Sequence, residues 1–418
     1  MMKLIIFDDT RTSDFYPLAQ TRPVFDLRCG ILKLRQRLEA HFGARTDSYL
    51  IMENRLHKLY QERHPDWKIN SIPKGDCLYL NSRIKLTAES LKYLKALDIE
   101  NCLLSGNQVV AARSAALSLD GKDITPPVIV EALKSHFKPQ IMPVDTETQD
   151  SRIVLYQSLA DLIHDNARLI EWDFHNFFDD KENYFETEPG VTVLHPYNIW
   201  LGEGVKLAPG VVLDASDGPI VVDEDAKVMP NAVVCGPTYI GKQCLVKIGA
   251  KIYGGTSIGK TSKIGGEVEG SIFQGYANKQ HDGFLGHAYI GEWVNLGADT
   301  NNSDLKNNYK SVSCYSYTQK IKLDSGSQFL GCLVGDHTKT GINCSINTGT
   351  VIGTGCNLWG RNLISDFIPD FSWGEADELS KYRFDAFCLT AGIVKNRRQL
   401  SFSDQEKEIY HELHTLET

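Results

Sequence analysis

An aliphatic residue recurs every six positions through the second half of the chain, and this period constrains the fold more than any other feature. Its members are Leu201, Leu207, Leu213, Val222, Val228, Val234, Ile240, Val246, Ile252, Ile258, Ile264, Ile290, Leu296, Val334, Thr340, Ile346, Ile352, Leu358 and Ile364, Thr340 being the one exception to the aliphatic rule. A helix would give a period of 3.6 and a simple strand a period of two, whereas six is typical of a hexapeptide β-helix. We therefore predict a triangular prism of short parallel strands over residues 199–364.

Small side chains two positions before the aliphatic residues also fit inside such a prism. Four of them are Cys244, Cys332, Cys344 and Cys356. We expect these thiols to be small buried apolar groups, because reactive cysteines need polar, accessible surroundings. Glycines such as Gly241 and Gly259 often follow the aliphatic residue. We expect them to turn the corners of the prism with positive φ.

Composition narrows the class of protein. The net charge is -9 with no long run of Lys and Arg, which argues against nucleic-acid binding, because phosphate neutralisation needs clustered cations. No stretch approaches the ~18 apolar residues of a membrane span. The apolar start of the chain is short and followed by Asp8 and Asp9, unlike a signal peptide. We expect a cytoplasmic protein that binds neither membranes nor nucleic acids.

The register breaks twice, between residues 264 and 290 and between residues 296 and 334. Insertions in a solenoid become surface loops, and such loops are often the working surface. The first break contains Glu269 and His281, and the second begins near Asn295 and continues past Lys310. N-acyl transfer needs a base that removes a proton from an attacking amine, and histidine suits that task. The alternative for His281 is a loop histidine without a catalytic role.

These segments resemble the acetyltransferase half of the GlmU family, bifunctional enzymes that make UDP-N-acetylglucosamine. The matching patterns are G-x-V-E from 266, H-x-x-x-L-G from 281, I-G-x-x-V-N-x-G-A-x-T from 290 and D-L-K from 304. The resemblance implies a left-handed coil, a homotrimer and acetyl-CoA as co-substrate. It also implies His281 as catalytic base, with substrate-binding and co-substrate-binding residues at Glu269, Asn295, Lys310 and Ala298.

The chain departs from that family at two positions. Phe284 stands where the family has a tyrosine, and Ser271 where it has a lysine. The identity of the amino sugar is therefore open. His287 and His337 lie beside resumed coils, and we expect structural roles for both.

The first half alternates candidate strands with candidate helices, which predicts an α/β domain with a Rossmann-like sheet. The expected strands are 3–7, 48–52 and 77–80, and the expected helices are 30–42, 87–97 and 156–170. We expect this domain to span residues 1–188, the β-helix residues 189–366, and a helical tail residues 367–418. In the tail we expect helices over residues 376–393 and 403–416, and such a helix would cover the open end of the prism and protect its edge.

Residues 18–30 resemble a sugar nucleotidyltransferase subfamily with the signature L-x-x-T-R-P-V-x-x-L-R-x-G. Ordinary members of that superfamily carry a glycine-rich phosphate loop after the first strand, but this chain has Asp8, Asp9 and Arg11 there. The arginines Arg11, Arg22 and Arg28 could bind the phosphates of a nucleoside triphosphate and a sugar 1-phosphate. Asp8 or Asp9 could hold Mg²⁺. Asn81 replaces the usual metal-binding motif as a substrate-binding candidate, and an inactive domain is an equal alternative.

The combined hypothesis is a transferase that joins nucleotidyl transfer, giving a UDP-N-acetylglucosamine-type product, to acetyl-CoA-dependent N-acetylation of an amino sugar phosphate. Three alternatives stay open: a nucleotidyltransferase whose β-helix only drives oligomerisation, an acetyltransferase whose N-terminal domain only binds a nucleotide sugar, and a non-enzymatic ligand sensor.

Overall fold

A computed structural model of the chain describes residues 2–43, 48–117, 119, 122–137, 139–141, 154–179, 183 and 186–416. The chain divides by internal contacts into two units. The first comprises residues 1–15, 21–27 and 33–158, and the second comprises residues 16–20, 28–32 and 159–418. The signature segment is thus shared between the units, and the main division falls at residue 158, whereas the sequence predicts it at 188.

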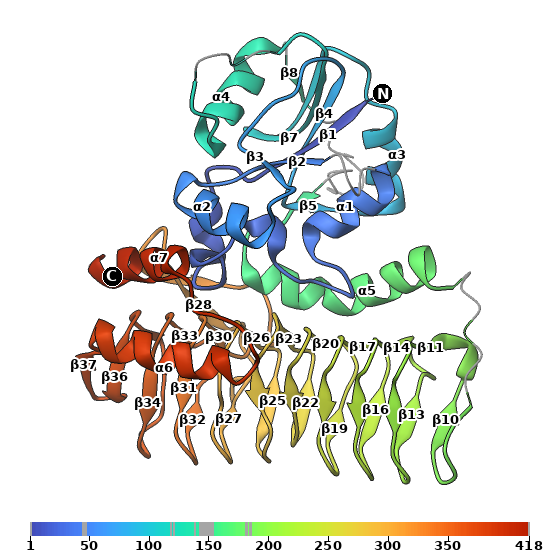
Figure 1. Cartoon of the computed structure of the whole chain (residues 1–418), viewed down its shortest axis with the longest axis vertical. Coiled ribbons are helices and arrows are strands. Elements are labelled where there is room, and N and C mark those ends of the chain that lie inside the picture. Colours follow the sequence, from blue (N-terminus) through green and yellow to red (C-terminus); the bar gives the residue numbers. More distant parts are fainter. Residues whose placement is uncertain are drawn as a thin grey trace. The chain divides into compact units, whose positions relative to one another are not determined.

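The first unit is built on a seven-stranded mixed sheet in the order β3-β2-β1-β4-β7-β6-β8 (Figure 1). Its strands are β1 (Lys3–Phe7), β2 (Ser48–Ile51), β3 (Lys68–Ile69), β4 (Cys77–Asn81), β6 (Asn101–Ser105), β7 (Gln108–Ser114) and β8 (Pro139–Ile141). Strand β1 runs parallel to β2 and β4, while β7 is antiparallel to β4. The predicted α/β class is confirmed, and the carboxyl ends of β1 and β4 bring Asp9 and Asn81 together.

The helices of the first unit are α1 (Leu34–Phe42), α2 (Asn54–Arg63), α3 (Ala88–Lys95) and α4 (Pro126–His136). Thr87 begins α3 with a capping box, in which its hydroxyl accepts from the Ser90 amide at 3.1 Å. Short pieces complete the unit: 3₁₀ turns η1 (Thr12–Phe15) and η3 (Val24–Asp26), and the strand pair β5 (Ile84–Lys85) and β9 (Val154–Leu155). The sequence pattern did not predict α2, α4 or the β6–β7 hairpin.

The second unit contains the predicted parallel β-helix, whose coils stack into three faces (Figure 1). Face A contains β10 (Thr192–Leu194), β13 (Val212–Asp214), β16 (Val233–Cys235), β19 (Lys251–Ile252), β22 (Glu267–Glu269) and β25 (Phe284–Gly286), continued by β27 (Asn301–Asn302) and β32 (Ser345–Ile346). Three such parallel faces are typical of the left-handed β-helix.

Face B contains β11 (Ile199–Leu201), β14 (Ile220–Val222), β17 (Thr238–Ile240), β20 (Thr256–Ile258), β23 (Ile272–Phe273), β26 (Tyr289–Ile290), β30 (Leu333–Val334), β33 (Val351–Ile352) and β35 (Phe367–Ile368). Face C contains β12 (Lys206–Leu207), β15 (Lys227–Val228), β18 (Leu245–Val246), β21 (Lys263–Ile264) and β24 (Asn278–Lys279), followed by β31 (Lys339–Thr340), β34 (Asn357–Trp359) and β36 (Ser372–Glu375). The chain passes from face B to face C to face A in each coil.

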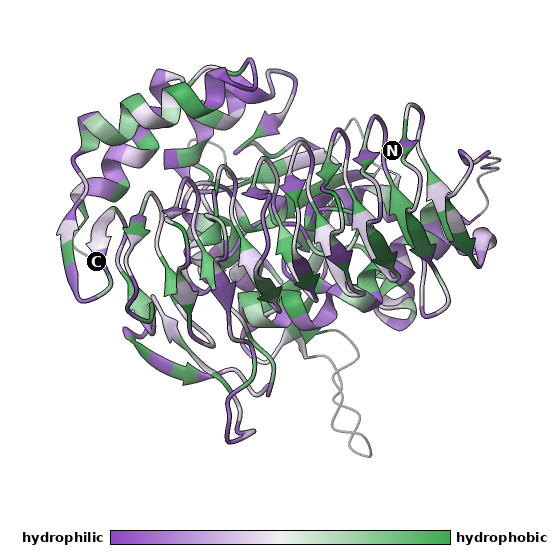
Figure 2. Cartoon of the chain, turned by 90° about the horizontal axis from the view of Figure 1, so that it is seen from below, coloured by the Kyte–Doolittle hydropathy of each residue, from purple (hydrophilic) through white to green (hydrophobic). Residues whose placement is uncertain are grey.

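The aliphatic residues of the six-residue register form the core of the prism, as predicted. Figure 2 shows apolar residues at equivalent places in successive coils. The four register cysteines are at most 2% exposed, and burial raises the pKa of the Cys244, Cys332 and Cys356 thiols to about 12. These thiols are therefore packing groups and poor nucleophiles.

Truncation of one core residue tests how much the stacked column stabilises the coil. We expect Ile258→Ala to lower the free energy of unfolding by about 2–5 kcal/mol, because it removes a fully buried side chain from the column. The matched control is Ile342, which has 68% of its surface accessible. We expect Ile342→Ala to change the free energy of unfolding by less than about 0.5 kcal/mol. Thermal melting of both variants gives the comparison, and equal shifts would contradict the assignment of Ile258 to the core.

The corner glycines have a different role from the one predicted. Gly241 and Gly259 do not have positive φ; instead, an added Cβ would lie 2.7 Å from the Ile258 carbonyl oxygen and 2.2 Å from that of Gln274, respectively. These glycines are required because neighbouring coils approach too closely for any side chain. The left-handed residue lies three positions after the register residue, as at Gln243 (φ 57°) and Thr261 (φ 59°).

The first register break is not an insertion, which corrects the prediction of a surface loop there. The coils continue through β22, β23, β24, β25 and β26 in unbroken pairing. Three intervals are shorter than six: Val268 and Phe273 follow Ile264 after four and five residues, and Ile290 follows Leu285 after five; all of these side chains are buried. The second break does contain an excursion, over residues 303–331, which carries a hairpin of β28 (Ser313–Ser316) and β29 (Ile321–Asp324).

Helix α5 (Leu159–Phe177) packs on face B, where Ile170 and Phe174 share a cluster with Val221 and Tyr239. The second-unit part of the signature segment is fixed beside it. The carbonyl oxygens of Arg28 and Gly30 accept from the hydroxyls of Tyr289 (2.7 Å) and Ser257 (2.9 Å). The other end of the segment, η2 (Leu18–Gln20), donates from Gln20 Nε2 to Asp370 at 2.6 Å.

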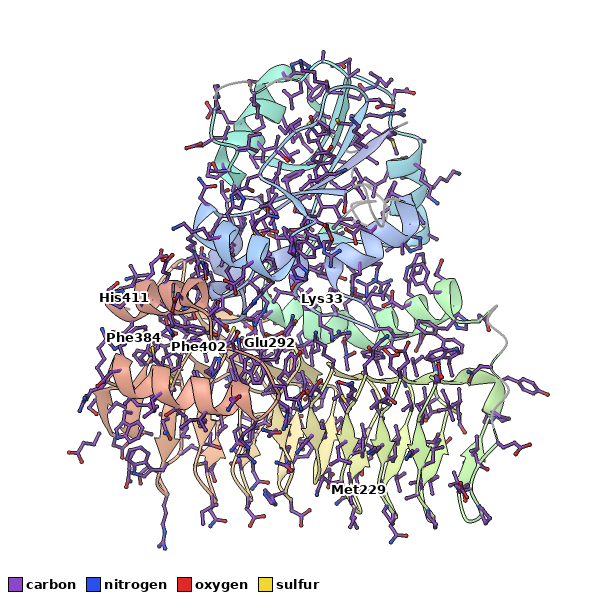
Figure 3. All side chains as sticks on the ribbon, viewed as in Figure 1. Lys33, Met229, Glu292, Phe384, Phe402 and His411 are labelled. Atoms are coloured by element: carbon purple, nitrogen blue, oxygen red, sulfur yellow. The ribbon has the colours of Figure 1, made fainter. Side chains whose placement is uncertain are left out.

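The tail contains α6 (Phe384–Asn396) and α7 (Asp404–Thr415), but the predicted helical stretch from 376 begins as strand β37 (Glu378–Lys381). This strand pairs with β36 and ends the prism, whereas α6 lies alongside the last coils (Figure 1). An aromatic cluster joins the helices to the coil, with Phe387 5.7 Å from His337 and 5.2 Å from Tyr410 between ring centroids. Phe384 and Phe402, labelled in Figure 3, lie in the same tail.

Across the described residues, every helix is too short or too polar to cross a membrane.

Candidate functional sites in the two units

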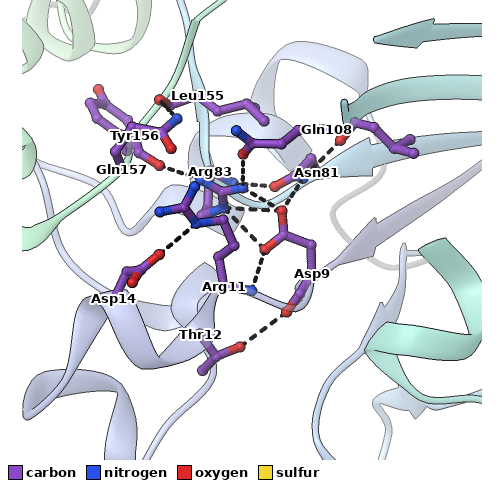
Figure 4. A network of polar contacts seen from close by, with 11 residues as sticks. Asp9, Arg11, Thr12, Asp14, Asn81, Arg83, Gln108, Leu155, Tyr156 and Gln157 are labelled. Carbon is purple, nitrogen blue, oxygen red and sulfur yellow. Dashed lines mark hydrogen bonds and ion pairs between the residues drawn. The ribbon is translucent and has the colours of Figure 1, made fainter. Parts of the chain in front are cut away.

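Asp9 lies at the carboxyl end of β1 inside a network of donors (Figure 4). Its carboxylate is ion-paired with Arg83 and accepts from Asn81 Nδ2 at 2.9 Å and from the Arg11 backbone amide at 3.0 Å. Burial alone would raise the pKa of Asp9, but the Arg83 guanidinium and the Asn81 amide lower it below its usual value. Asp9 is therefore held as an anion whose oxygens are already paired.

Asp8, the neighbouring carboxylate, is turned the other way into the unit. Its two oxygens accept from the backbone amides of Val24 (2.8 Å) and Phe25 (3.2 Å) at the start of η3. Burial raises the pKa of Asp8 to about 7. Asp8 thus attaches the T-R-P-V segment to the end of β1.

The contacts of Asp8 and Asp9 do not fit a magnesium ion held by both. Magnesium needs carboxylate oxygens that can be presented in an octahedral shell, mostly beside water and phosphate oxygens. Here every carboxylate oxygen accepts hydrogen bonds from amides or from Arg83. No group of three or more His, Cys, Asp or Glu suited to a metal ion occurs among the described residues.

The three candidate phosphate-binding arginines differ in exposure. Arg11 is 42% exposed in its side chain and pairs with Asp14 at 2.5 Å, so its guanidinium is accessible. Arg22 is 3% exposed, and its positive charge is one of those that lower the pKa of Asp26. Arg28 belongs to the second unit, donates to the Ile31 carbonyl oxygen and lies 5.0 Å from the Tyr239 ring centre, which is a structural position.

Asn81 and Arg83 are each held by a further hydrogen bond to a backbone carbonyl oxygen. Asn81 Nδ2 also donates to the Val109 carbonyl oxygen at 2.9 Å, and Arg83 Nη1 donates to the Tyr156 carbonyl oxygen at 2.6 Å. Arg83 is not among the candidates that the sequence suggests. Its burial could not be read from the sequence, because Asp9 is 74 positions away.

In the second unit, His281 lies at the corner between face C and face A, between β24 and β25. The imidazole is exposed, and Ala298 occupies the same corner one coil later, where the Asp299 amide donates to the Asp282 carbonyl oxygen at 3.1 Å. The structure therefore brings together His281 and Ala298, two of the predicted residues. An exposed imidazole at a corner is accessible to an amine substrate.

Lys279 is a functional candidate that the sequence did not reveal. It pairs with Ile264 in the coil below, so it fills an inward position of the prism, and it is 1% exposed. Its ammonium donates to the His281 carbonyl oxygen at 2.6 Å, and burial lowers the pKa of Lys279 to about 8. A buried cation in an apolar column is costly unless it has a partner, and this contact holds the backbone that carries His281.

Glu269 and His287 lie at the opposite edge of face A. Glu269 is exposed, and its carbonyl oxygen accepts from the His287 amide at 3.0 Å. The His287 Nδ1 is 2.8 Å from Asp304, and its ring lies against Gly270 and 5.2 Å from Phe329. This pair fixes the start of the 303–331 excursion, which agrees with the structural role expected for His287.

Asn295 and Lys310 are separated from His281 in different ways. Asn295 projects from face C, in register with Asn278 and Lys339. Lys310 is exposed on the excursion, next to the exposed Tyr309. Within one chain, Glu269 and Asn295 therefore lie on different faces, with the His281 corner between them.

Residues 4–182 match the family model described as sugar nucleotidyl transferase. GlmU of Synechococcus elongatus, described as a bifunctional protein, is 27% identical over 202 residues, which cover 43% of this chain and 40% of that protein. A bifunctional sugar-1-phosphate nucleotidylyltransferase/acetyltransferase of Sulfurisphaera tokodaii is 29% identical over 160 residues, covering 38% of this chain and 39% of the relative.

The chain spans about 40% of the length of the first of these curated relatives. An acetyltransferase of Escherichia coli, YaiX, described as uncharacterized, is 26% identical over 179 residues and is covered over 77% of its length. Among solved structures, the UDP-N-acetylglucosamine acyltransferase from Campylobacter jejuni aligns over 54% of this chain and 95% of its own, with 14% identity and a TM-score of 0.32.

Proposed function

We propose that the β-helix acetylates the amino group of an amino sugar phosphate. The chain joins this hexapeptide-repeat β-helix to a sugar nucleotidyl transferase domain. The observation that carries the proposal is the corner at His281, where Lys279 holds the backbone carbonyl oxygen, the imidazole is exposed, and Ala298 follows one coil later. The sequence similarity to bifunctional nucleotidyltransferase/acetyltransferases supports it.

In this reaction the amine nitrogen attacks the thioester carbonyl carbon of acetyl-CoA. His281 removes a proton from that nitrogen, a C–N bond forms, and the C–S bond breaks to release the coenzyme thiol. Lys279 is a positioning residue that acts through the His281 backbone. Glu269 on face A would bind the sugar, as would Lys310 from the excursion.

The placement of these residues favours a site between subunits. Glu269 and Asn295 project from two faces that diverge from the His281 corner, so one small ligand cannot contact both in a single chain. A homotrimer would place a face of a second subunit against this corner and complete the groove. We propose this assembly, in the cytoplasm, where nucleoside triphosphates, sugar phosphates and acetyl-CoA are available.

For the first unit we propose transfer of a nucleotidyl group from a nucleoside triphosphate to a sugar 1-phosphate, giving a UDP-N-acetylglucosamine-type product and pyrophosphate. Arg11 is the accessible cation for a phosphate oxygen, and its backbone is tied to Asp9. The family match supports this activity. Because Asp8 and Asp9 do not fit a magnesium site, we assign no step of the transfer to them.

A second candidate function follows from that misfit. The first unit would bind a nucleotide sugar without turnover, and the β-helix alone would be catalytic. The Asp9–Arg83 pair favours this alternative, because it places a fixed cation on the carboxylate that a catalytic metal would need.

One pair of assays separates the two candidates. Pyrophosphate release is measured over a panel of nucleoside triphosphates and sugar 1-phosphates with Mg²⁺, beside thiol release from acetyl-CoA with glucosamine 1-phosphate. We expect both products from the bifunctional enzyme, whereas thiol alone would support the binding-domain alternative. Pyrophosphate alone would contradict acetyl transfer to this acceptor and favour a scaffold role for the β-helix.

A further inference from the structure

A cationic pocket lies on face C of the second unit, where the end of α6 covers the coil. The cavity is about 260 Å³, and its lining is Lys263, Tyr276, Asn278, Gln280, Trp293, Asn295, Lys339, Val394, Arg397 and Arg398. Four of these side chains are cationic and none is acidic. We propose that this pocket binds the phosphate groups of a nucleotide.

The β-helix supplies one wall as a column of polar side chains in register. Lys263 pairs with Asn278, Asn278 with Asn295, and Asn295 with Lys339 across four successive coils. Because successive coils repeat the same geometry, these side chains project side by side from face C. The column therefore places two ammonium groups and two amides on one face, and the Lys339 ammonium also donates to the His337 carbonyl oxygen at 2.7 Å.

The tail supplies the second wall and two guanidinium groups. Arg398 donates to Asn278 Oδ1 at 3.4 Å, which places the end of α6 over the column, and Arg397 is exposed beside it. Guanidinium groups match phosphate oxygens with paired donors, which ammonium groups and amides can supplement.

The charges of this pocket lack a protein counter-ion in the described part of the chain. Among the ion pairs there, none includes Lys263, Lys339, Arg397 or Arg398. Burial lowers the pKa of Lys263, and the nearby Arg398 and Arg397 lower it further; burial also lowers the pKa of Lys339 to about 8. Like charges collected in a partly enclosed space repel one another, and a bound anion would remove that cost.

The pocket is rigid on its aromatic side. Tyr276 and Trp293 stack with ring centres 4.3 Å apart, and Lys260 and Lys395 lie 5.3 and 5.5 Å from the two rings. The Lys395 ammonium is in turn paired with Glu406 of α7. Since Gln280 lines the pocket and His281 follows it, the site adjoins the proposed acetylation corner, yet the inference rests on the lining charges and not on the proposed activity.

Two ligands of the proposed function carry this chemistry: coenzyme A and a nucleotide sugar. Isothermal titration of the full chain with coenzyme A, dephospho-coenzyme A, 3′,5′-ADP and UDP distinguishes them. Tight binding of coenzyme A and 3′,5′-ADP but not of the dephospho form identifies the acyl donor, whereas preference for UDP identifies the nucleotide sugar. Absence of millimolar or tighter binding by all four probes would overturn the proposal.

Variants connect the binding to the pocket. We expect Arg397→Gln/Arg398→Gln to raise the Kd of the bound probe at least about tenfold, and added salt to weaken binding to the unsubstituted chain. Arg397→Gln alone, at an exposed position, tests the same point without disturbing α6. Lys242→Gln removes an exposed cation paired with Glu224 elsewhere on the coil and should leave the Kd unchanged.

The binding test of the pocket does not depend on whether the chain catalyses acetyl transfer. An unchanged Kd in Arg397→Gln and in the double variant, with normal melting temperatures, would overturn the pocket even if acetyl transfer is found. Conversely, the chain could bind a probe in a way that the pocket variants weaken, yet release no thiol from acetyl-CoA. That outcome would support the pocket as a binding site and contradict the proposed acetyl transfer.

Discussion

Replacing His281 by alanine is expected to lower kcat for acetyl transfer by about 100- to 10,000-fold, because it removes the base that accepts the amine proton. The side chain is exposed, so the melting temperature should change little. Pyrophosphate release by the first unit should persist, because the two reactions are assigned to different units. Thiol release and pyrophosphate release, measured on one preparation, give both numbers.

Three companion variants make this result specific. His175→Ala removes an exposed histidine, 59% accessible and paired with Asp179, and should keep full activity. His287→Ala and Asp304→Ala should lower the melting temperature and raise KM, since the pair fixes the excursion. If His287→Ala and Asp304→Ala abolish kcat while His281→Ala retains it, His287 is the base and the assignment of His281 is wrong. Equal loss of both activities in His281→Ala would contradict separate sites.

The β-helix could be predicted from the sequence because its core repeats. Each inward position meets the same environment one coil later, so residues such as Val234 and Ile252 are found by counting alone. The same counting fails at residue 279, because the shortened intervals after Ile264 move an inward position there and a lysine fills it. The contact between its ammonium and the His281 carbonyl oxygen depends on three-dimensional geometry, and the sequence shows only a missing aliphatic residue.

Two of the wrong expectations about the second unit have local causes. Shortened faces after Ile264 keep the stack intact, but they change the period in the same way as an insertion would. The strand β37 was predicted as helix because Ala376–Lys381 contains residues that suit either state, and its pairing with β36 decides the outcome. The period of one segment does not show which other strand that segment pairs with.

The site of the first unit was less predictable than the coil. Asp9, Asn81 and Arg11 were identified as candidates because they stand where related nucleotidyltransferases carry their phosphate loop and metal-binding motif. The partners of Asp9 were not identified. A carboxylate at such an edge can bind a metal or an arginine, and only the position of Arg83 distinguishes these cases.

Replacing Arg83 by methionine is expected to lower the free energy of unfolding of the first unit by about 3–5 kcal/mol. Arg83 is 1% and Asp9 8% exposed in their side chains, so the substitution leaves a buried carboxylate without its cation. The control is Arg113→Met, whose partner Asp76 is 2.8 Å away in a half-exposed pair; we expect a change of about 0–1 kcal/mol. Urea unfolding followed by a probe in the first unit gives both values.

The pH dependence of that loss identifies its cause. The pKa of Asp9 is lowered in the folded chain, so the pair contributes stability above the unfolded pKa near 3.8 and loses it as pH falls through the folded value. In the Arg83→Met variant burial favours the protonated form of Asp9, so the cost of the unpaired carboxylate is relieved as pH falls, and the difference from the unsubstituted chain should be largest near pH 7 and shrink toward pH 4. Asp9→Asn combined with Arg83→Met should recover part of the stability. A loss that is equal at both pH values, and not recovered in the double variant, would mean that Arg83 stabilises the unit by packing and not by neutralising Asp9.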